Sequence, residues 1–285
     1  MRLLPVIYQK EENKVAKTNK AKLEQFYNLG LSLEKEGKFD EAAEAYRQAL
    51  EADPDDFGGI KIRLASINRG ETPKTASKAY VATLFDQNAD MFDYILVDQL
   101  GYDVPLQLRD QLLKVFPDVT YEKMLDLGCG TGLSADALDD LTSDKTGVDL
   151  SENMIEIAHE KGDYQHLFVG DAVEFVTRSN EEWNLIIATD VLPYMGDINV
   201  FFDKLSHRLA PKGIFGFSTE TLTDRAFDGS DYKVGPHQRF AHHENYIRKE
   251  LVKNGMECVS VNNIVVRAEQ GEPVHGQLFV AQKRS

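Results

Sequence analysis

Residues 126–132 read Asp-Leu-Gly-Cys-Gly-Thr-Gly, and they close a short apolar run that begins at Lys123. Glycines at alternate positions let the backbone adopt strained dihedral angles and approach a ligand closely. The next residues, 133–141, have the apolar spacing of a helix. This stretch therefore predicts a strand, a tight glycine turn and a helix, the unit that opens a nucleotide-binding α/β domain.

The alternation of strand and helix continues beyond this unit. We predict strands at 145–150, 166–169, 183–189 and 214–218 and helices at 151–161, 173–178, 200–209 and 243–254. Two further strands, 257–267 and 275–282, flank Gly271-Glu-Pro273 and form a hairpin. Repeated βα units imply a parallel sheet with helices on both faces, and the hairpin adds one antiparallel strand at its edge.

Acidic residues stand at the carboxyl ends of the first four strands: Asp126, Asp149, Asp171 and Asp190. Open α/β sheets bind ligands at this edge, and Asp149 is placed to hold a ribose diol. The glycine spacing is Gly-x-Gly-x-Gly, whereas a dinucleotide turn has Gly-x-Gly-x-x-Gly. Asp126 beside the glycines would repel a pyrophosphate but attract an ammonium or sulfonium group. The pattern therefore favours a cationic ligand over a dinucleotide.

These four motifs at the ends of successive strands, in this order, resemble the core of a class I S-adenosylmethionine-dependent methyltransferase over residues 121–220. The resemblance implies a seven-stranded Rossmann-like sheet with an antiparallel edge strand. It also implies cofactor roles: Asp126, Gly128, Cys129 and Gly130 around the methionine part, Asp149 at the ribose, Leu150 and Met154 at the adenine ring, Asp171 and Ala172 at its amino edge, and Asp190 and Val191 beside the methyl group.

Residues 23–52 have the spacing of two helices, broken at Gly37-Lys38, with Asp40 as the expected N-cap of the second. The pair resembles a tetratricopeptide repeat (TPR), whose signature positions are matched by Phe26, Leu29, Gly30, Leu33, Ala42, Tyr46, Ala49 and Pro54. One further helix is expected at 57–70. The pair either packs on its own protein or presents a surface for a peptide or for self-association.

The whole chain resembles bacterial predicted methyltransferases that contain a TPR repeat. We expect a charged tail or leading helix at 1–22, the TPR-like segment at 23–70, a linker with lid helices at 71–120, and the methyltransferase domain at 121–285. The resemblance places Tyr80 and Phe92 in the lid, over the cofactor.

The formal charge of −15 is concentrated in residues 121–220, where 7 basic and 19 acidic side chains give −12. This field argues against nucleic acid as the main partner. No apolar stretch approaches the roughly 20 residues of a membrane span. The two cysteines form no disulfide framework and no metal-ligand pattern. We therefore expect a reduced compartment, the cytoplasm, and no metal.

The methyl acceptor is less defined. Candidate catalytic residues are Tyr194 and His242, although His242 could instead flank the following helix; candidate substrate residues are Glu220, His237 and Arg239. The segment Asp190-Val-Leu-Pro-Tyr194 has one residue more than the Asn/Asp-Pro-Pro-Tyr motif of enzymes that methylate planar amides or base amino groups, so those acceptors are disfavoured. We expect a small acidic or neutral metabolite. The alternatives are a protein methyltransferase that recruits its target through the TPR-like pair, and a non-catalytic scaffold that binds the cofactor.

Overall fold

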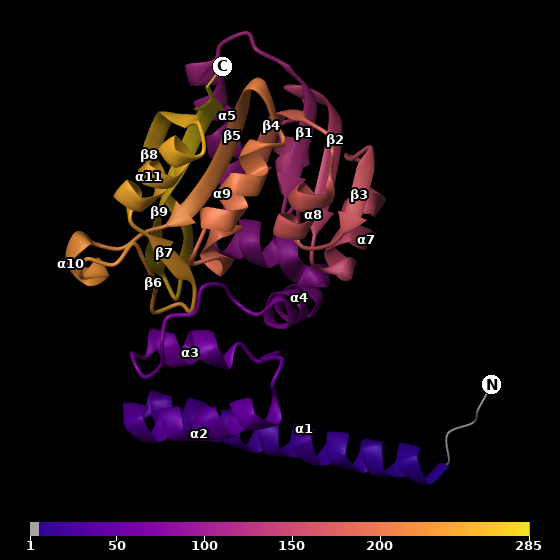
Figure 1. The fold of residues 1–285 in the computed structure, drawn as a ribbon, viewed down its shortest axis with the longest axis vertical. Helices are drawn as coiled ribbons and strands as arrows, with labels where there is room; N and C mark the ends of the chain where they lie inside the picture. Colours follow the sequence, from indigo (N-terminus) through magenta and orange to yellow (C-terminus); the bar gives the residue numbers. More distant parts are fainter. Residues whose placement is uncertain (1–5, 285) are drawn as a thin grey trace.

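The computed structural model describes the backbone of residues 6–284 and the side chains of residues 19–284. A layer of helices lies on one side of an α/β domain, and Figure 1 shows this layer beneath the sheet. In the described chain from residue 6 onward, the helices before the first strand are α1 (Val6–Lys35), α2 (Phe39–Ala52), α3 (Ile60–Ser66), α4 (Lys78–Asp86), the 3₁₀ helix η1 (Ala89–Met91), the π-helix η2 (Tyr94–Gln99) and α5 (Val104–Val115).

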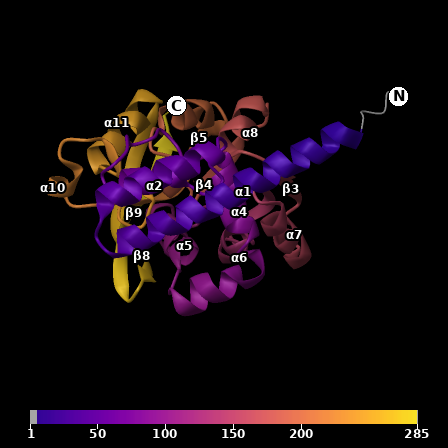
Figure 2. The same ribbon diagram turned by 90° about the horizontal axis from the view of Figure 1, so that it is seen from below.

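The predicted pair of TPR-like helices is α1 and the antiparallel α2, with α1 crossing below the whole domain in Figure 2. The helices touch because Gly30 has no side chain: a Cβ at this position would lie 2.4 Å from the ring of Tyr46. The expected N-cap at Asp40 is wrong. Helix α2 begins at Phe39 and Asp40 lies in its first turn, because Gly37, with φ +75°, already turns the chain before Lys38.

Helix α3 is shorter than the predicted helix at 57–70, because residues with positive φ stand at both of its ends. Asp56 (φ 56°) and Gly59 (φ 64°) precede it, and Asn68 (φ 57°) follows it. The Asp56 carboxylate accepts a hydrogen bond from the Ile60 amide at 2.6 Å and so caps the first turn.

The sheet has the predicted class I arrangement. Its strands are β1 (Tyr121–Leu127), β2 (Thr142–Asp149), β3 (His166–Val169), β4 (Trp183–Ala188), β5 (Leu209–Glu220), β6 (Tyr232–Val234), β7 (Phe240–His242), β8 (Met256–Glu269) and β9 (Glu272–Lys283). The order is β3-β2-β1-β4-β5-β7-β6, and β9 pairs antiparallel with both β5 and β8. The predicted hairpin is therefore confirmed, with its antiparallel strand between β5 and β8.

The helices between the strands are α6 (Leu133–Ala137), α7 (Glu152–Lys161), α8 (Ala172–Arg178), η3 (Leu192–Tyr194), α9 (Asn199–Ser206), α10 (Asp224–Phe227) and α11 (Glu244–Lys253). Residues 221–242 contain α10 and the β6–β7 hairpin, for which the sequence pattern predicts no helix or strand. Strands of three residues are too short to show an alternating pattern in the sequence.

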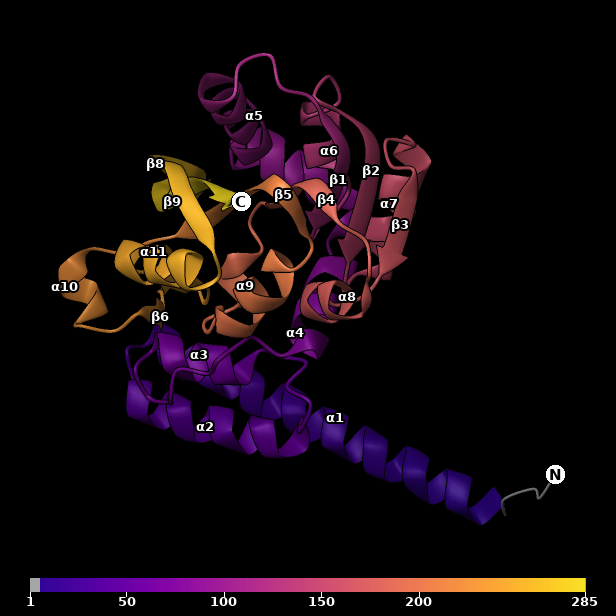
Figure 3. The same ribbon diagram turned by 45° about the horizontal axis from the view of Figure 1, so that its top comes forward.

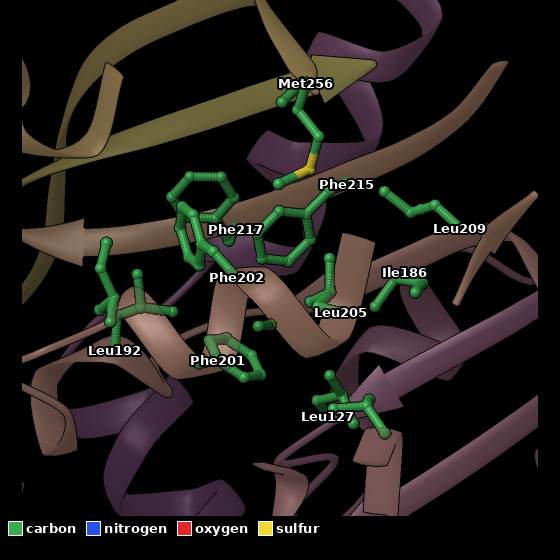
Figure 4. Close-up of a cluster of buried hydrophobic side chains, with 14 of the residues drawn as sticks. Leu127, Ile186, Leu192, Phe201, Phe202, Leu205, Leu209, Phe215, Phe217 and Met256 are labelled. Atoms are coloured by element: carbon green, nitrogen blue, oxygen red, sulfur yellow. The ribbon is translucent and has the colours of Figure 1, made fainter. Parts of the chain in front are cut away.

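The core lies on both faces of the sheet and fixes the ends of the central strands. Phe202 on α9 packs edge-on against Phe215 and Phe217 of β5, at ring distances of 5.5 and 5.4 Å (Figure 4). Such aromatic contacts add to the large apolar area that these rings bury. The neighbouring Phe201 lines the cavity described next, so the same helix anchors the core and forms a wall of the site.

Within residues 6–284, no helix combines the length and the apolar character that crossing a membrane requires.

Candidate active site

A cavity of about 490 Å³ lies at the carboxyl ends of β1, β2 and β4. This volume is within the range of roughly 300–1,000 Å³ that is usual for small-molecule sites. Its floor comes from the glycine turn and the strand ends, and residues between Lys74 and Pro105 cover it. In Figure 3, α4 lies between the sheet and the TPR-like helices and covers this edge of the sheet.

The glycine turn is shaped so that its backbone faces the cavity. Gly128 has φ +70°, and a Cβ there would meet Val191 at 2.4 Å; Gly130 has φ +53°. The Gly130 amide donates to Asp149 Oδ2 at 2.9 Å. Side chains are excluded here by both conformation and space, which leaves room for a ligand against the turn.

Asp149 and Asp171 lie on the cavity wall. Asp149 Oδ1 accepts from the Ser151 amide at 2.8 Å, and burial raises the pKa of this carboxyl although its hydrogen bonds oppose the rise. Asp171 caps α8 by accepting from the Glu174 amide at 2.9 Å, and Lys78 Nζ lies 3.3 Å from the same oxygen. The neighbours Leu150 and Ala172 also line the cavity, next to their acids, as do Cys129 and Phe92.

Two residues of the predicted cofactor site lie behind the wall. Asp126 is fully buried and accepts from the Tyr164 hydroxyl at 2.6 Å, while its Oδ1 has no hydrogen-bond partner among the described residues. Burial raises the pKa of Asp126 to about 7. Met154 is also fully buried. Neither side chain lines the cavity, so any effect of these residues on a ligand passes through the glycine turn or through Leu150.

The lid is tied to the domain by two aspartates. Asp86 accepts from Ser151 Oγ at 2.5 Å, next to Asp149. Asp93 accepts from Thr131 Oγ1 at 2.5 Å, in the glycine turn, and from Lys161 at 2.6 Å. These bonds hold the lid against both sides of the cavity mouth.

The aromatic residues of the lid differ in position. Phe85 and Phe92 line the cavity, and the Phe85 ring packs edge-on against Tyr194 at 5.4 Å. Tyr80 does not line it; its ring lies against Gly59, where a Cβ would approach within 2.7 Å. Tyr80 therefore joins the lid to the segment before α3.

A charged cluster closes the far end of the cavity, and its centre is a residue that the sequence did not reveal. Arg267 of β8 is 1% exposed and donates to Asp190 Oδ2 at 3.1 Å, to Glu220 at 2.5 Å and to Glu269 at 2.8 Å. Burial raises the pKa of Glu220, and the two nearby guanidinium groups oppose this rise. Asp190 Oδ1 has no hydrogen-bond partner among the described residues. This oxygen is itself buried, although Asp190 is among the residues that line the cavity.

Arg239 joins this cluster to Tyr194. Its Nε donates to the Tyr194 hydroxyl at 3.3 Å, and its Nη1 donates to Glu269. Arg239, Tyr194, Asp190 and Val191 line the cavity, whereas Glu220 and His237 do not. His237 Nδ1 lies 2.7 Å from Glu269 Oε2. Of the three predicted substrate residues, only Arg239 faces the ligand space.

His242 lies outside the cavity. It is fully buried at the end of β7, and its Nε2 is 2.8 Å from the Met195 carbonyl oxygen. Burial lowers the pKa of His242 to about 4. A neutral ring that donates to a carbonyl group has a structural role, so we do not retain His242 as a catalytic base. The cap of α11 is His243, which accepts from the Asn245 amide.

The functional residues that sequence reasoning missed are Arg267 and Lys78. A basic residue at the end of the predicted apolar strand 257–267 was a usable signal, because a buried charge needs partners. Lys78 lies in the linker, where the sequence gives no signal for its pairing with Asp171. In the part of the chain with described side chains, no group of three His, Cys, Asp or Glu residues could hold a metal ion.

Comparison with known proteins gives two family matches. A model described as a methyltransferase domain matches residues 100–261, and a tetratricopeptide repeat model matches residues 24–56. The first covers more than half of the chain, and the second covers the carboxyl-terminal part of α1 and all of α2.

Curated relatives and solved structures agree with these matches. The ubiquinone biosynthesis O-methyltransferase of Coxiella burnetii is 28% identical over 160 residues, 51% of this chain and 68% of that protein. The N-methyltransferase NodS of Bradyrhizobium japonicum, solved with S-adenosylhomocysteine, covers 72% of this chain and 99% of its own, with a TM-score of 0.56 and 16% identity. The magnesium protoporphyrin IX methyltransferase of Synechocystis covers 72% of this chain and 99% of its own, with a TM-score of 0.54 and 18% identity. At such identities, the solved structures establish the fold.

Proposed function

We propose a function from the premise that this chain belongs to the methyltransferase domain family. It is a methyltransferase that uses S-adenosylmethionine, which supplies an electrophilic methyl group on a sulfonium. The acceptor that we propose is a small, largely apolar molecule with one hydroxyl or amino group. The observation that carries this proposal is the cavity of about 490 Å³, which the lid covers.

The cavity residues fit the cofactor. A carboxylate oxygen can accept two hydrogen bonds, so Asp149, which receives one amide on each oxygen, keeps a lone pair on each for the two ribose hydroxyls. Gly128, Cys129 and Gly130 line the cavity, so the methionine part would lie against the backbone of the glycine turn. Asp171 and the Ala172 backbone would hold the adenine edge. Asp126 lies behind the turn and does not line the cavity.

The closed lid over the cavity favours a small acceptor over a protein side chain. Because Asp86 and Asp93 tie the lid to Ser151, Thr131 and Lys161, a folded protein could reach the methyl group only after these hydrogen bonds had opened. A small molecule needs only the room beside the cofactor. Exclusion of water by a closed lid also strengthens the electrostatic interactions inside the site.

The chemistry of the walls indicates the acceptor class. Apolar side chains from the lid, α5 and α6 line the cavity: Leu96, Leu100, Pro105 and Leu133. At the charged end, the Tyr194 side chain lines the cavity beside Asp190, and its hydroxyl would orient the protic group of the acceptor. Methyl transfer requires the nucleophile to be held about 3–3.5 Å from the methyl carbon. The curated relatives, named as O-methyltransferases of ubiquinone biosynthesis, support an acceptor with an apolar body.

The cofactor site is tested by calorimetry with S-adenosylhomocysteine. Asp149→Ala removes the ribose acceptor and should weaken binding roughly tenfold to a hundredfold, since each lost charged hydrogen bond is worth about 1.5–3 kcal/mol. Asp144→Ala is the matched control, because Asp144 is on the same strand with a half-exposed side chain that faces His166. Equal affinities for both variants would contradict the site assignment.

The acceptor class is tested with isotopically labelled S-adenosylmethionine and a cell extract divided into a deproteinised fraction and a protein fraction. We expect the label in apolar small molecules of the first fraction. Label on proteins would favour the protein methyltransferase. Tight cofactor binding without label transfer in either fraction would favour a non-catalytic scaffold.

A further inference from the structure

The TPR-like helices and the acceptor end of the cavity are connected through one side chain, Arg63 of α3. Its Nη1 lies 3.1 Å from Glu34 Oε2 in α1, and its Nη2 donates to Gln238 Oε1 at 2.9 Å. The guanidinium carbon also stands 5.8 Å from the ring centres of both Tyr27 and Tyr46. The side chain is only 16% exposed, so these contacts are largely shielded from water.

Gln238 belongs to the tight turn between β6 and β7. Its own φ is +59°, and the Gly235 amide donates to the Arg239 carbonyl oxygen across the turn. A left-handed conformation at a residue other than glycine is costly, so surrounding contacts must hold it. Figures 1 and 3 show α3 directly beneath β6, in agreement with this contact. The α3 contact therefore fixes the turn from outside.

The opposite side of the same turn faces the cavity. Arg239, the next residue, donates to Tyr194 at 3.3 Å and pairs with Glu269. Apolar packing follows the same route, because Ile62 of α3 and Phe240 of β7 share one buried cluster. The turn is thus held between Arg63 on the helical side and the charged cluster on the cavity side.

We propose that Arg63 is a positioning residue for the methyl acceptor. The TPR-like pair then serves as the outer support of the β6–β7 turn and keeps Arg239 and Tyr194 in place at the acceptor end. This inference rests on the function proposed above for the cavity. It gives the α1–α2 pair a task within its own chain, and that task needs no bound peptide.

The test compares Arg63→Met with Arg69→Met in the full chain. Met keeps much of the apolar stem and removes the polar contacts with Glu34 and Gln238. Arg69 is the control, because it follows α3 and pairs with Asp40 of α2 but has no described contact with residues 235–239. Initial rates with labelled S-adenosylmethionine are measured against dilutions of the deproteinised extract, and S-adenosylhomocysteine affinity is measured by calorimetry.

We expect Arg63→Met to raise the apparent KM for the extract acceptor roughly tenfold, as loss of one charge-assisted contact would, with kcat and cofactor affinity changed less than about twofold. Gln238→Ala should reproduce this effect, and the double variant should add little to it. Arg63→Lys should rescue it only in part, because one ammonium group cannot replace the guanidinium fork. An unchanged KM for Arg63→Met would overturn the proposal, as would equal falls in kcat and cofactor affinity.

A second readout does not depend on the acceptor. Backbone hydrogen exchange of residues 235–242 should be faster in Arg63→Met than in the wild type and in Arg69→Met. Equal exchange in all three proteins would overturn the inference even if no acceptor is found. If the wild type transfers no label from the extract, the proposed function fails, whereas this exchange result still decides the role of Arg63.

Discussion

Arg267 of β8 donates from Nη1 to Asp190 Oδ2 over 3.1 Å, and this pair joins the carboxyl-terminal hairpin to the residue that follows β4. Strands β9 and β5 lie between the two partners in the sheet. Asp190 is held with φ 59°, and its amide donates to Ser218 at 2.7 Å. The ion pair therefore fixes a strained residue at the charged end of the cavity, where the acceptor would bind.

Replacing Arg267 should destabilise the fold. Arg267→Met removes the guanidinium that pairs with Asp190 and leaves Glu220 with Arg239 alone, 4.0 Å away, and removing one member of a buried ion pair costs about 3–5 kcal/mol. Urea unfolding measures this loss. Arg248→Met is the control, since Arg248 is 41% exposed and pairs with Glu244 on the same helix; its effect should stay within about 1 kcal/mol. The double variant Arg267→Met/Glu220→Gln should recover part of the loss, and a purely additive result would contradict this explanation.

Gly128→Ala should weaken cofactor binding through the backbone. The new methyl group would lie 2.4 Å from Val191 Cγ2, and φ is +70° at this position. Adding Val191→Ala removes the collision but leaves the unfavourable φ, so it should restore part of the affinity for S-adenosylhomocysteine. Gly229→Ala is the control, because φ there is +76° with nothing within 4 Å of the new Cβ and the residue is away from the cavity. Full affinity in Gly128→Ala would show that the turn has more room than the structure gives it.

The sequence predicted the fold well because the signals were local. The glycine turn, the acids at strand ends and the helical spacing each depend on neighbouring residues, and they placed Asp149, Asp171 and Asp190 at one edge of the sheet. The position of Asp126 behind the turn could not be predicted, since Tyr164 occupies the space that a ligand contact would need.

Residues far apart in the sequence carry the rest of the site. The contacts of Arg267 with Asp190 and of Arg63 with Gln238 span 77 and 175 residues, and no periodicity records such pairs. His242 was misjudged for a related reason. The β6–β7 hairpin places the His242 ring in the interior. Its strands have only three residues each, so the sequence shows no alternating pattern that predicts which side chains are buried.

Asp126 should make the stability of the ligand-free protein fall as the pH rises. Its pKa is about 7 in the folded state because of burial, against an ordinary value of 3.8. Between these values the folded state holds a proton that the unfolded state has lost, so raising the pH favours unfolding. In Asp126→Asn this contribution disappears, and the variant should gain about 2–4 kcal/mol relative to the wild type between about pH 4 and pH 8. A constant difference across this range would contradict the assignment.

His242 should act in the opposite direction. Its pKa is about 4 in the folded state, because burial disfavours the charged ring, against an ordinary value of 6.5. Between these values only the unfolded state binds the proton, so stability is lost as the pH falls from about 6.5 to about 4, by about 3 kcal/mol at most.

Because the slopes of Asp126 and His242 partly cancel in the wild type, the effect of His242 is best measured in the Asp126→Asn background. There His242→Gln, whose amide can still donate to the Met195 carbonyl, should remove the acid-side loss. His207→Gln should not remove it, because His207 is 66% exposed. Since His242 lies outside the cavity, His242→Gln should also keep the pH profile of kcat measured with labelled cofactor. A shifted profile would restore His242 as a candidate base, and an unchanged acid-side loss would show that its ring is charged in the folded protein.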